Sequence, residues 1–181
     1  MAATKHVALL RGINVGRGKR ITMDRLRAFC HELGYPDAVT YLQSGNVIFT
    51  ATPARAQRLP ATLERRIVDE LGMRVRVLVR ARDELAAVVS GNPLPHRTAD
   101  PQRFMVTFLS AAPDPARIPQ LETADFLPEE YRFVGREVYL GCQEGYQLTQ
   151  LSGDVWDKRL SVVATTRNWN TVTKLAALTA A

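Results

Sequence analysis

The chain has 181 residues and a formal net charge of +6, from 24 Lys and Arg against 18 Asp and Glu. Hydrophobic residues make up 46% of the chain, which is enough for a substantial core. No apolar run approaches the roughly 18 residues that a membrane helix needs, and strand-like sequence begins too early for a signal peptide. We therefore expect a cytoplasmic protein with no membrane partner.

The charge is distributed unevenly along the chain. Residues 1–82 carry 15 Lys and Arg against 6 Asp and Glu, giving +9, whereas residues 83–181 carry 9 against 12, giving −3. A basic half can attract polyanions such as nucleic acid, although a solvated surface has the same composition. Cys30 and Cys142 are too few for a disulfide framework, and no metal-ligand spacing is present, so we expect no metal and no cofactor.

Strand and helix patterns alternate in the first half. Apolar residues recur at helical spacing after Thr22, which can cap the helix, and again every four residues from Leu59 to Leu71. Two β-rich runs flank a Ser-Gly-Asn turn, which is typical of a hairpin. The predicted elements are a strand at 7–11, a helix at 23–33, a hairpin at 39–43 and 47–51, a helix at 59–71 and a strand at 74–80. This β-α-β-β-α-β order predicts a ferredoxin-like unit.

The second half partly repeats this order. A short helix at 83–90 and a stretch rich in Pro and Gly make residues 83–101 the best candidate boundary. The later predicted elements are a strand at 104–109, a helical turn near 118–124, a hairpin at 131–134 and 138–140, and helices near 154–163 and 168–178. We expect an α+β fold of two ferredoxin-like (βαββαβ-type) subdomains packed together, plus C-terminal helices. Residues 1–82 form the basic subdomain and residues 102–181 the second.

Three segments are candidates for ligand binding. A right-handed crossover makes the first two strands parallel, so the glycine-rich loop after the first strand, the Ser-Gly-Asn turn and Arg74 should converge at one sheet edge. The third segment, Thr165–Thr171, opens the last helix. The candidate binding residues are Arg11, Gly12, Asn14, Gly16, Lys19, Ser44, Gly45, Asn46, Thr166, Arg167, Asn168 and Trp169.

The glycine-rich loop matches neither the Walker A motif nor the dinucleotide fingerprint. Gly18-Lys19 is followed by Arg20 rather than Ser or Thr, and a third glycine is missing at position 21. The loop could still offer backbone N–H groups and cations to an anion. Each segment also has a structural interpretation: a turn with glycines at positive φ, a hairpin turn, and the cap and core face of a helix.

Three motifs together resemble the signatures of a bacterial family known as domain of unknown function 1697. They are Val7-Ala8-Leu9-Leu10-Arg11-Gly12-Ile13-Asn14-Val15-Gly16, Leu42-Gln43-Ser44-Gly45-Asn46-Val47 and Thr165-Thr166-Arg167-Asn168-Trp169-Asn170-Thr171. The resemblance implies two ferredoxin-like subdomains and no established activity, cofactor or catalytic residue. Where the family usually has a Gly-Gly step, this chain has Gly16-Arg17-Gly18.

Three functions remain open from the sequence. The first is a binding module for an anionic ligand, either nucleic acid or a nucleotide-like or phosphorylated small molecule. The second is a metal-free enzyme on a small anionic substrate, with Arg11, Asn46, Arg167 or Asn168 as orienting groups, although no general base or nucleophile stands out. The third is an interaction or scaffold protein, monomeric or homodimeric through an exposed sheet edge.

Overall fold

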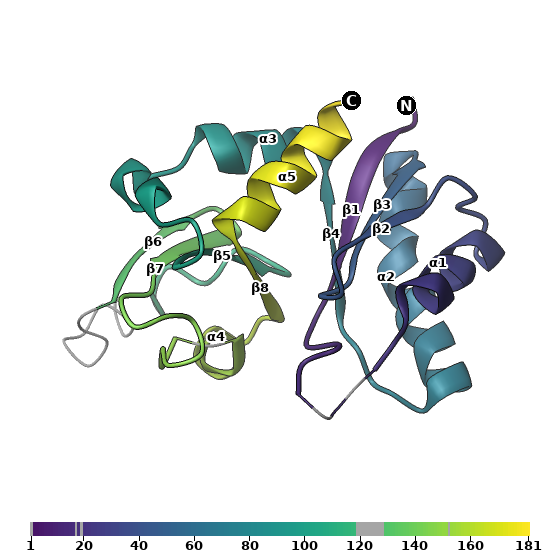
Figure 1. Ribbon diagram of the computed structural model, residues 1–181, viewed down its shortest axis with the longest axis horizontal. Helices are drawn as coiled ribbons and strands as arrows, with labels where there is room; N and C mark the ends of the chain where they lie inside the picture. The colour runs from purple at the N-terminus through teal and green to yellow at the C-terminus, as the bar shows by residue number, and fades with distance from the viewer. Residues whose placement is uncertain (1, 17, 19, 119–128, 152) are drawn as a thin grey trace. The chain divides into compact units, whose positions relative to one another are not determined.

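The computed structural model describes residues 2–16, 18, 20–118, 129–151 and 153–181 (Figure 1). Within these residues the fold is mixed α+β, with two four-stranded antiparallel sheets and five α-helices. The chain divides into two compact units, Met1–Ala86 with Leu175–Ala181, and Ala87–Lys174, and each unit contains one sheet. No helix among the described residues is long and apolar enough to cross a membrane.

The first unit contains the sheet with strand order β2-β3-β1-β4. Its elements are β1 (Thr4–Leu10), α1 (Met23–Glu32), β2 (Val39–Tyr41), β3 (Asn46–Ala51), α2 (Pro53–Leu71) and β4 (Val77–Ala81). β3 pairs antiparallel with both β1 and β2, so β1 and β2 run in the same direction, as the predicted crossover requires. β4 pairs antiparallel with the other side of β1.

Helices α1 and α2 bury their apolar faces in one core with the sheet. Leu26 and Phe29 of α1 and Leu63 of α2 are fully buried with Leu10 of β1. The side chain of Thr22 caps α1, because its hydroxyl accepts the backbone N–H of Arg25 at 3.2 Å. Both the helical spacing and this cap were predicted correctly.

Helix α2 is longer than its periodicity predicts. It begins at Pro53 rather than near Leu59, and Pro60 lies inside it. Proline is favoured in the first helical turn, because the backbone N–H groups there have no intrahelical acceptor and losing one costs no hydrogen bond. The start of α2 is therefore set by proline rather than by the apolar repeat.

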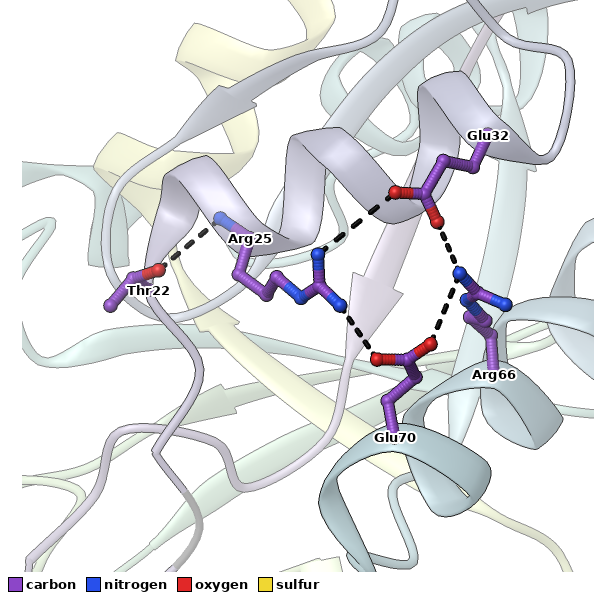
Figure 2. A network of polar contacts seen from close by, with 5 residues as sticks. All are labelled: Thr22, Arg25, Glu32, Arg66 and Glu70. Atoms are coloured by element: carbon purple, nitrogen blue, oxygen red, sulfur yellow. Dashed lines mark hydrogen bonds and ion pairs between the residues drawn. The ribbon is translucent and has the colours of Figure 1, made fainter.

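An ion-pair ring, made of Arg25, Glu32, Arg66 and Glu70, joins α1 to α2 (Figure 2). Arg25 contacts Glu70 at 2.6 Å and Glu32 at 3.9 Å, while Arg66 contacts the same two carboxylates. Both guanidinium groups also lie over the ring of Phe29, at 4.5 and 5.8 Å from its centroid. Since these side chains are a third to a half exposed, water and salt screen the ring.

The ring makes a modest and salt-dependent contribution to stability. We expect Glu70→Gln to lower the free energy of unfolding by about 1 kcal/mol at low salt, because both arginines lose a partner. Asp69→Asn is the matched control and should cost about 0.3 kcal/mol or less, since Asp69 forms an ion pair with the exposed Arg65, at 3.7 Å, outside the ring. Urea unfolding at low and high salt measures both. Equal losses for the two variants would contradict a cooperative ring.

The second unit contains the sheet with order β6-β7-β5-β8. The remaining elements are α3 (Arg82–Ser90), the 3₁₀ helix η1 (Pro95–Ala99), β5 (Phe104–Leu109), β6 (Glu130–Val134), β7 (Glu137–Gly141), α4 (Gly153–Leu160), β8 (Ala164–Asn168) and α5 (Trp169–Ala180). Helix α3 begins in the first unit, and the last residues of α5 belong to it. The helical turn expected near 118–124 falls almost wholly outside the described residues.

The sequence pattern does not predict the strand β8. It places the last helix from about Asn168 and the segment Thr165–Thr171 at the start of that helix, whereas Ala164–Asn168 pairs antiparallel with β5 along its whole length. Thr166 and Thr107 face each other in this pairing, and their hydroxyls are 2.8 Å apart. Such cross-strand pairing stabilises a sequence whose own strand propensity is weak.

The two sheets share the same strand order, with the first strand of each lying between the third and the fourth. The N–H of Leu10 donates to Gly45 and that of Leu109 donates to Arg136, each from the end of a first strand to a hairpin turn. Each fourth strand also buries one arginine opposite a valine of the first strand, Arg80 opposite Val7 and Arg167 opposite Val106. This correspondence supports the repetition that the element order indicated.

Candidate functional site

The glycine-rich loop, the hairpin turn and the segment before β4 meet at one edge of the first sheet. The N–H of Leu10 donates to the carbonyl of Gly45 at 2.9 Å, and the N–H of Arg11 donates to the carbonyl of Arg76 at 2.9 Å. The predicted convergence of these segments is confirmed. We call this region, residues 11–21, 42–46 and 74–76, the loop edge.

Asn14 holds the loop in shape. Its Nδ2 donates to the carbonyls of Ile21 and Gln43, each at 2.8 Å, and its Oδ1 accepts the N–H of Ile21 at 2.9 Å. Its backbone is left-handed, with φ +58°, a conformation that Asn tolerates better than most residues. One side chain thus closes the loop between Asn14 and Ile21 and ties it to the hairpin turn.

Gly45 is required by close packing as well as by its backbone. Its φ is +76°, and a Cβ placed there would lie 2.5 Å from Cδ1 of Ile13 and 2.9 Å from Cβ of Leu10. Ile13 is almost fully buried, so the turn and the loop fit together through the space that this glycine leaves.

Asn46 and Ser44 stabilise the turn from inside. The side chain of Asn46 is fully buried, and its Nδ2 donates to the carbonyl of Tyr41 at 2.7 Å and to Oγ of Ser44 at 3.1 Å. Because its amide is engaged within the hairpin, Asn46 contributes to the loop edge by shaping it.

A pocket of about 310 Å³ opens between the loop and the turn. Asn14, Arg20, Ile21, Thr22 and Gln43 line it. Arg20 is exposed, and its Nη2 donates to the carbonyl of Gly16 at 3.1 Å, which leaves most of its guanidinium donors directed to solvent. Of these five residues only Asn14 was predicted. Gln43 lies within the second motif, and Arg20, Ile21 and Thr22 lie between the first motif and the helix α1, so the predicted convergence of these segments is the signal that could have found them.

Two apolar side chains adjoin the pocket residues and are exposed. Val15 follows Asn14 and is 71% exposed, and Leu42 precedes Gln43 and is 50% exposed. The backbone of Leu42 has φ +59°, a strained conformation for a residue with a branched side chain. The loop edge therefore offers apolar surface beside its cations.

Cations are concentrated at the loop edge and acids are scarce there. Among the described residues, the loop and the segment at 74–76 supply four cations, Arg11, Arg20, Arg74 and Arg76. Residues 1–23 and 38–63 contain no Asp or Glu. Glu64, on α2, contacts Arg76 at 3.4 Å and accepts the N–H of Val77. Lys19 and Arg17 lie outside the described residues. The described part of the loop edge is thus a basic surface around a pocket.

The candidates at 166–169 lie in the second unit and have structural contacts there. The hydroxyl of Thr166 bonds those of Thr107 and Tyr146. Arg167 is 7% exposed, and its Nη1 donates to Oγ1 of Thr165 at 3.0 Å and to the carbonyl of Thr166 at 2.9 Å. Burial lowers the pKa of Arg167 to about 10, a value at which it still carries its charge at neutral pH.

Asn168 and Trp169 begin helix α5. Oδ1 of Asn168 accepts the N–H of Thr171 at 2.9 Å and its hydroxyl at 2.7 Å, which confirms the predicted cap. The ring of Trp169 packs against that of Phe104, with centroids 5.0 Å apart. Both residues therefore act in the packing of the second unit.

The buried thiols are poor candidates for nucleophiles. Burial raises the pKa of Cys30 to about 12. Burial and the charge of Glu129 also raise the pKa of Cys142 to about 12, although the charge of Arg97 acts in the opposite direction. Since the thiolate is the reactive form, neither residue is activated at neutral pH.

The described residues define a two-unit α+β protein with a basic loop edge in its first unit. The chain belongs to the family of proteins of unknown function DUF1697, whose model matches residues 3–139. It is also similar to a solved structure, the conserved bacterial protein SP0830 from Streptococcus pneumoniae, with 25% sequence identity and a TM-score of 0.76. The similarity covers 97% of this chain and 98% of that one. No curated protein matches the chain.

Proposed function

We propose that this protein binds an anionic ligand at the loop edge, the ligand being nucleic acid or a phosphorylated small molecule. The observation that carries the proposal is the position of the pocket beside Arg20, between two acid-free segments of a chain half with net charge +9. Guanidinium groups bind phosphate through paired hydrogen bonds, and an amide group such as that of Gln43 can orient it.

The neighbouring apolar side chains narrow the ligand class. Val15 and Leu42 place exposed hydrocarbon next to the pocket residues. A ligand that joins a phosphate to a flat apolar group, such as a nucleobase, would cover this surface and meet the cations at once. This combination favours a nucleotide unit, free or within a strand, over inorganic phosphate.

We also infer that each unit is ferredoxin-like in the strict sense. The support is the chain order β-α-β-β-α-β in the first unit with sheet order β2-β3-β1-β4, and the repeated order β6-β7-β5-β8 in the second. Both cysteines are free, which is consistent with a cytoplasmic location, where nucleic acids and phosphorylated metabolites are abundant.

The test compares Arg20→Ala with Arg58→Ala. Both variants remove one positive charge. Arg58 is an exposed residue in the first half of α2, whereas it is the C-terminal end of that helix that leads to the loop-edge residues 74–76. We expect Arg20→Ala to weaken binding of a fluorescent single-stranded oligonucleotide or a labelled nucleotide about tenfold, since a charge-assisted hydrogen bond is lost. Arg58→Ala should change the affinity by less than about twofold.

Fluorescence anisotropy over a salt series measures both variants. The affinity should fall steeply with salt, and for an oligonucleotide Arg20→Ala should reduce the salt slope by about one. The proposal is wrong if neither probe binds in a salt-dependent way at low ionic strength, or if the two variants weaken binding equally.

A further inference from the structure

The second unit contains a second pocket, separate from the loop edge. Its volume is about 340 Å³, and it lies where η1 leads into β5 and where β7 ends. The lining residues are His96, Arg97, Ala99, Asp100, Arg103, Cys142 and Gln143. Its size is at the lower end of the range for small-molecule sites.

Arg97 is held in this pocket by two features of the sheet. Glu130 of β6 and Gly141 of β7 are cross-strand partners, so their side-chain positions lie on the same face. Because Gly141 has no side chain, Arg97 occupies the space: a Cβ at Gly141 would lie 2.7 Å from Nε and 3.1 Å from Cζ of Arg97. Beside it, Oε2 of Glu130 accepts the Nε–H of Arg97 at 2.8 Å.

The anchoring of Arg97 leaves its terminal nitrogens available. Within the described residues, the Arg97 side chain makes one hydrogen bond, from Nε to Glu130, and it is 28% exposed. Nη1 and Nη2 therefore offer their donors at the pocket. A guanidinium fixed at Nε by a carboxylate is preorganised, since little side-chain entropy remains to be lost on binding.

The walls of the pocket are also fixed. The N–H of Cys142 donates to the carbonyl of Arg103 at 2.8 Å, and Nη1 of Arg103 donates to the carbonyl of Gln143 at 2.9 Å. The hydroxyl of Thr98 bonds the carbonyl of Pro95 within η1. These bonds fix the positions of the two segments that line the pocket, residues 95–103 and 142–143.

Among the described residues, two arginines and three carboxylates surround the pocket. Arg97 lies beside Glu130, and Arg103 lies beside Asp100, whose Oδ2 is 3.7 Å from its Nε. The third carboxylate, Glu129, accepts the N–H of Gln143 at 3.2 Å. Because the carboxylates outnumber the arginines, a ligand with one negative charge is repelled less than a ligand with two.

We propose that this second pocket binds a small monocarboxylate, with Nη1 and Nη2 of Arg97 as the carboxylate-binding groups. Planar, two-point recognition by guanidinium suits the carboxylate, and the carboxylates around the pocket disfavour a dianion. Ala99 and Cys142 provide the less polar part of the lining, against which the body of the ligand lies. This site is independent of the one proposed at the loop edge.

The experiment is a titration of the full chain, labelled with ¹⁵N, with acetate, propanoate, benzoate and inorganic phosphate at constant ionic strength. We expect saturable shifts of the amides at 95–103 and 141–143 with a monocarboxylate, and weaker or no shifts with phosphate. Arg97→Lys keeps the charge but removes the fork, and should weaken binding at least tenfold. Arg132→Lys, at an exposed position of β6, is the matched control and should bind as the unchanged protein does.

A second variant keeps the proposal open to disproof if Arg97→Lys unfolds. Gly141→Ala should displace Arg97 without changing any charge, and should also weaken binding, while circular dichroism reports whether the sheet persists. The proposal is overturned if no carboxylate produces saturable shifts at these amides. Tighter binding of phosphate than of any monocarboxylate, or unchanged binding in a folded Arg97→Lys or Gly141→Ala variant, would overturn it equally.

Discussion

Gly45→Ala is expected to lower the free energy of unfolding by about 2–5 kcal/mol. A residue with a side chain pays about 1–2 kcal/mol for the left-handed backbone at φ +76°, and forcing a methyl group against Ile13 and Leu10 adds about 1–3 kcal/mol. The clash with Leu10 involves its Cβ, which cannot move without the strand. Urea unfolding followed by circular dichroism measures the loss.

Gly12→Ala is the matched control for this effect. Gly12 has a similar φ of +62°, but no atom lies within 4 Å of the position that its Cβ would take. It should therefore lose only the backbone contribution, about 1–2 kcal/mol. If the two alanine variants were equally stable, the contact between turn and loop would contribute nothing, and the packing role assigned to Gly45 would be incorrect.

Asn14→Ala is expected to cost about 4 kcal/mol and to open the glycine-rich loop. The substitution removes three hydrogen bonds, each contributing about 1 kcal/mol, and places alanine in a left-handed conformation. The sharpest measurement is hydrogen exchange of the Ile21 amide, because its N–H is bonded to Oδ1 of Asn14. Its protection should fall together with the global stability.

Asn14→Gly separates the two contributions. Glycine adopts the left-handed backbone without strain, so the variant loses the hydrogen bonds alone. We expect it to be more stable than Asn14→Ala by about 1 kcal/mol, yet still less stable than the unchanged protein. Full protection of the Ile21 amide in Asn14→Gly would mean that the amide side chain does not hold the loop.

The candidate site was predictable in part because its location follows from strand direction. The helical crossover makes β1 and β2 run in the same direction, and this brings the loop after β1 to the same sheet edge as the hairpin turn after β2. The motif residues could be located in this way, but their roles could not. Asn46 is buried within the hairpin and Asn14 binds the loop, so two polar residues that resemble ligand contacts act first in shaping the edge.

The sequence by itself determined the elements whose signals are local. Helical spacing and the Thr22 cap specify α1, and β-rich runs around a turn specify the hairpin of β2 and β3. These features depend on residues within a few positions of one another, so they can be read without knowledge of the rest of the chain.

Only the tertiary structure decided the features that depend on distant partners. Ala164–Asn168 becomes a strand because β5 pairs with it, and the segment Leu175–Ala181 belongs to the first unit although it ends the chain. Gln43 joins the pocket through its bond to Asn14, twenty-nine residues earlier. Arg97 of η1 is positioned by two strands: Gly141 of β7 leaves room for its side chain, and Glu130 of β6 accepts its Nε–H. The physical reason is that pairing and packing are properties of surfaces formed when the chain closes on itself, and no short stretch of sequence contains both sides of such a contact.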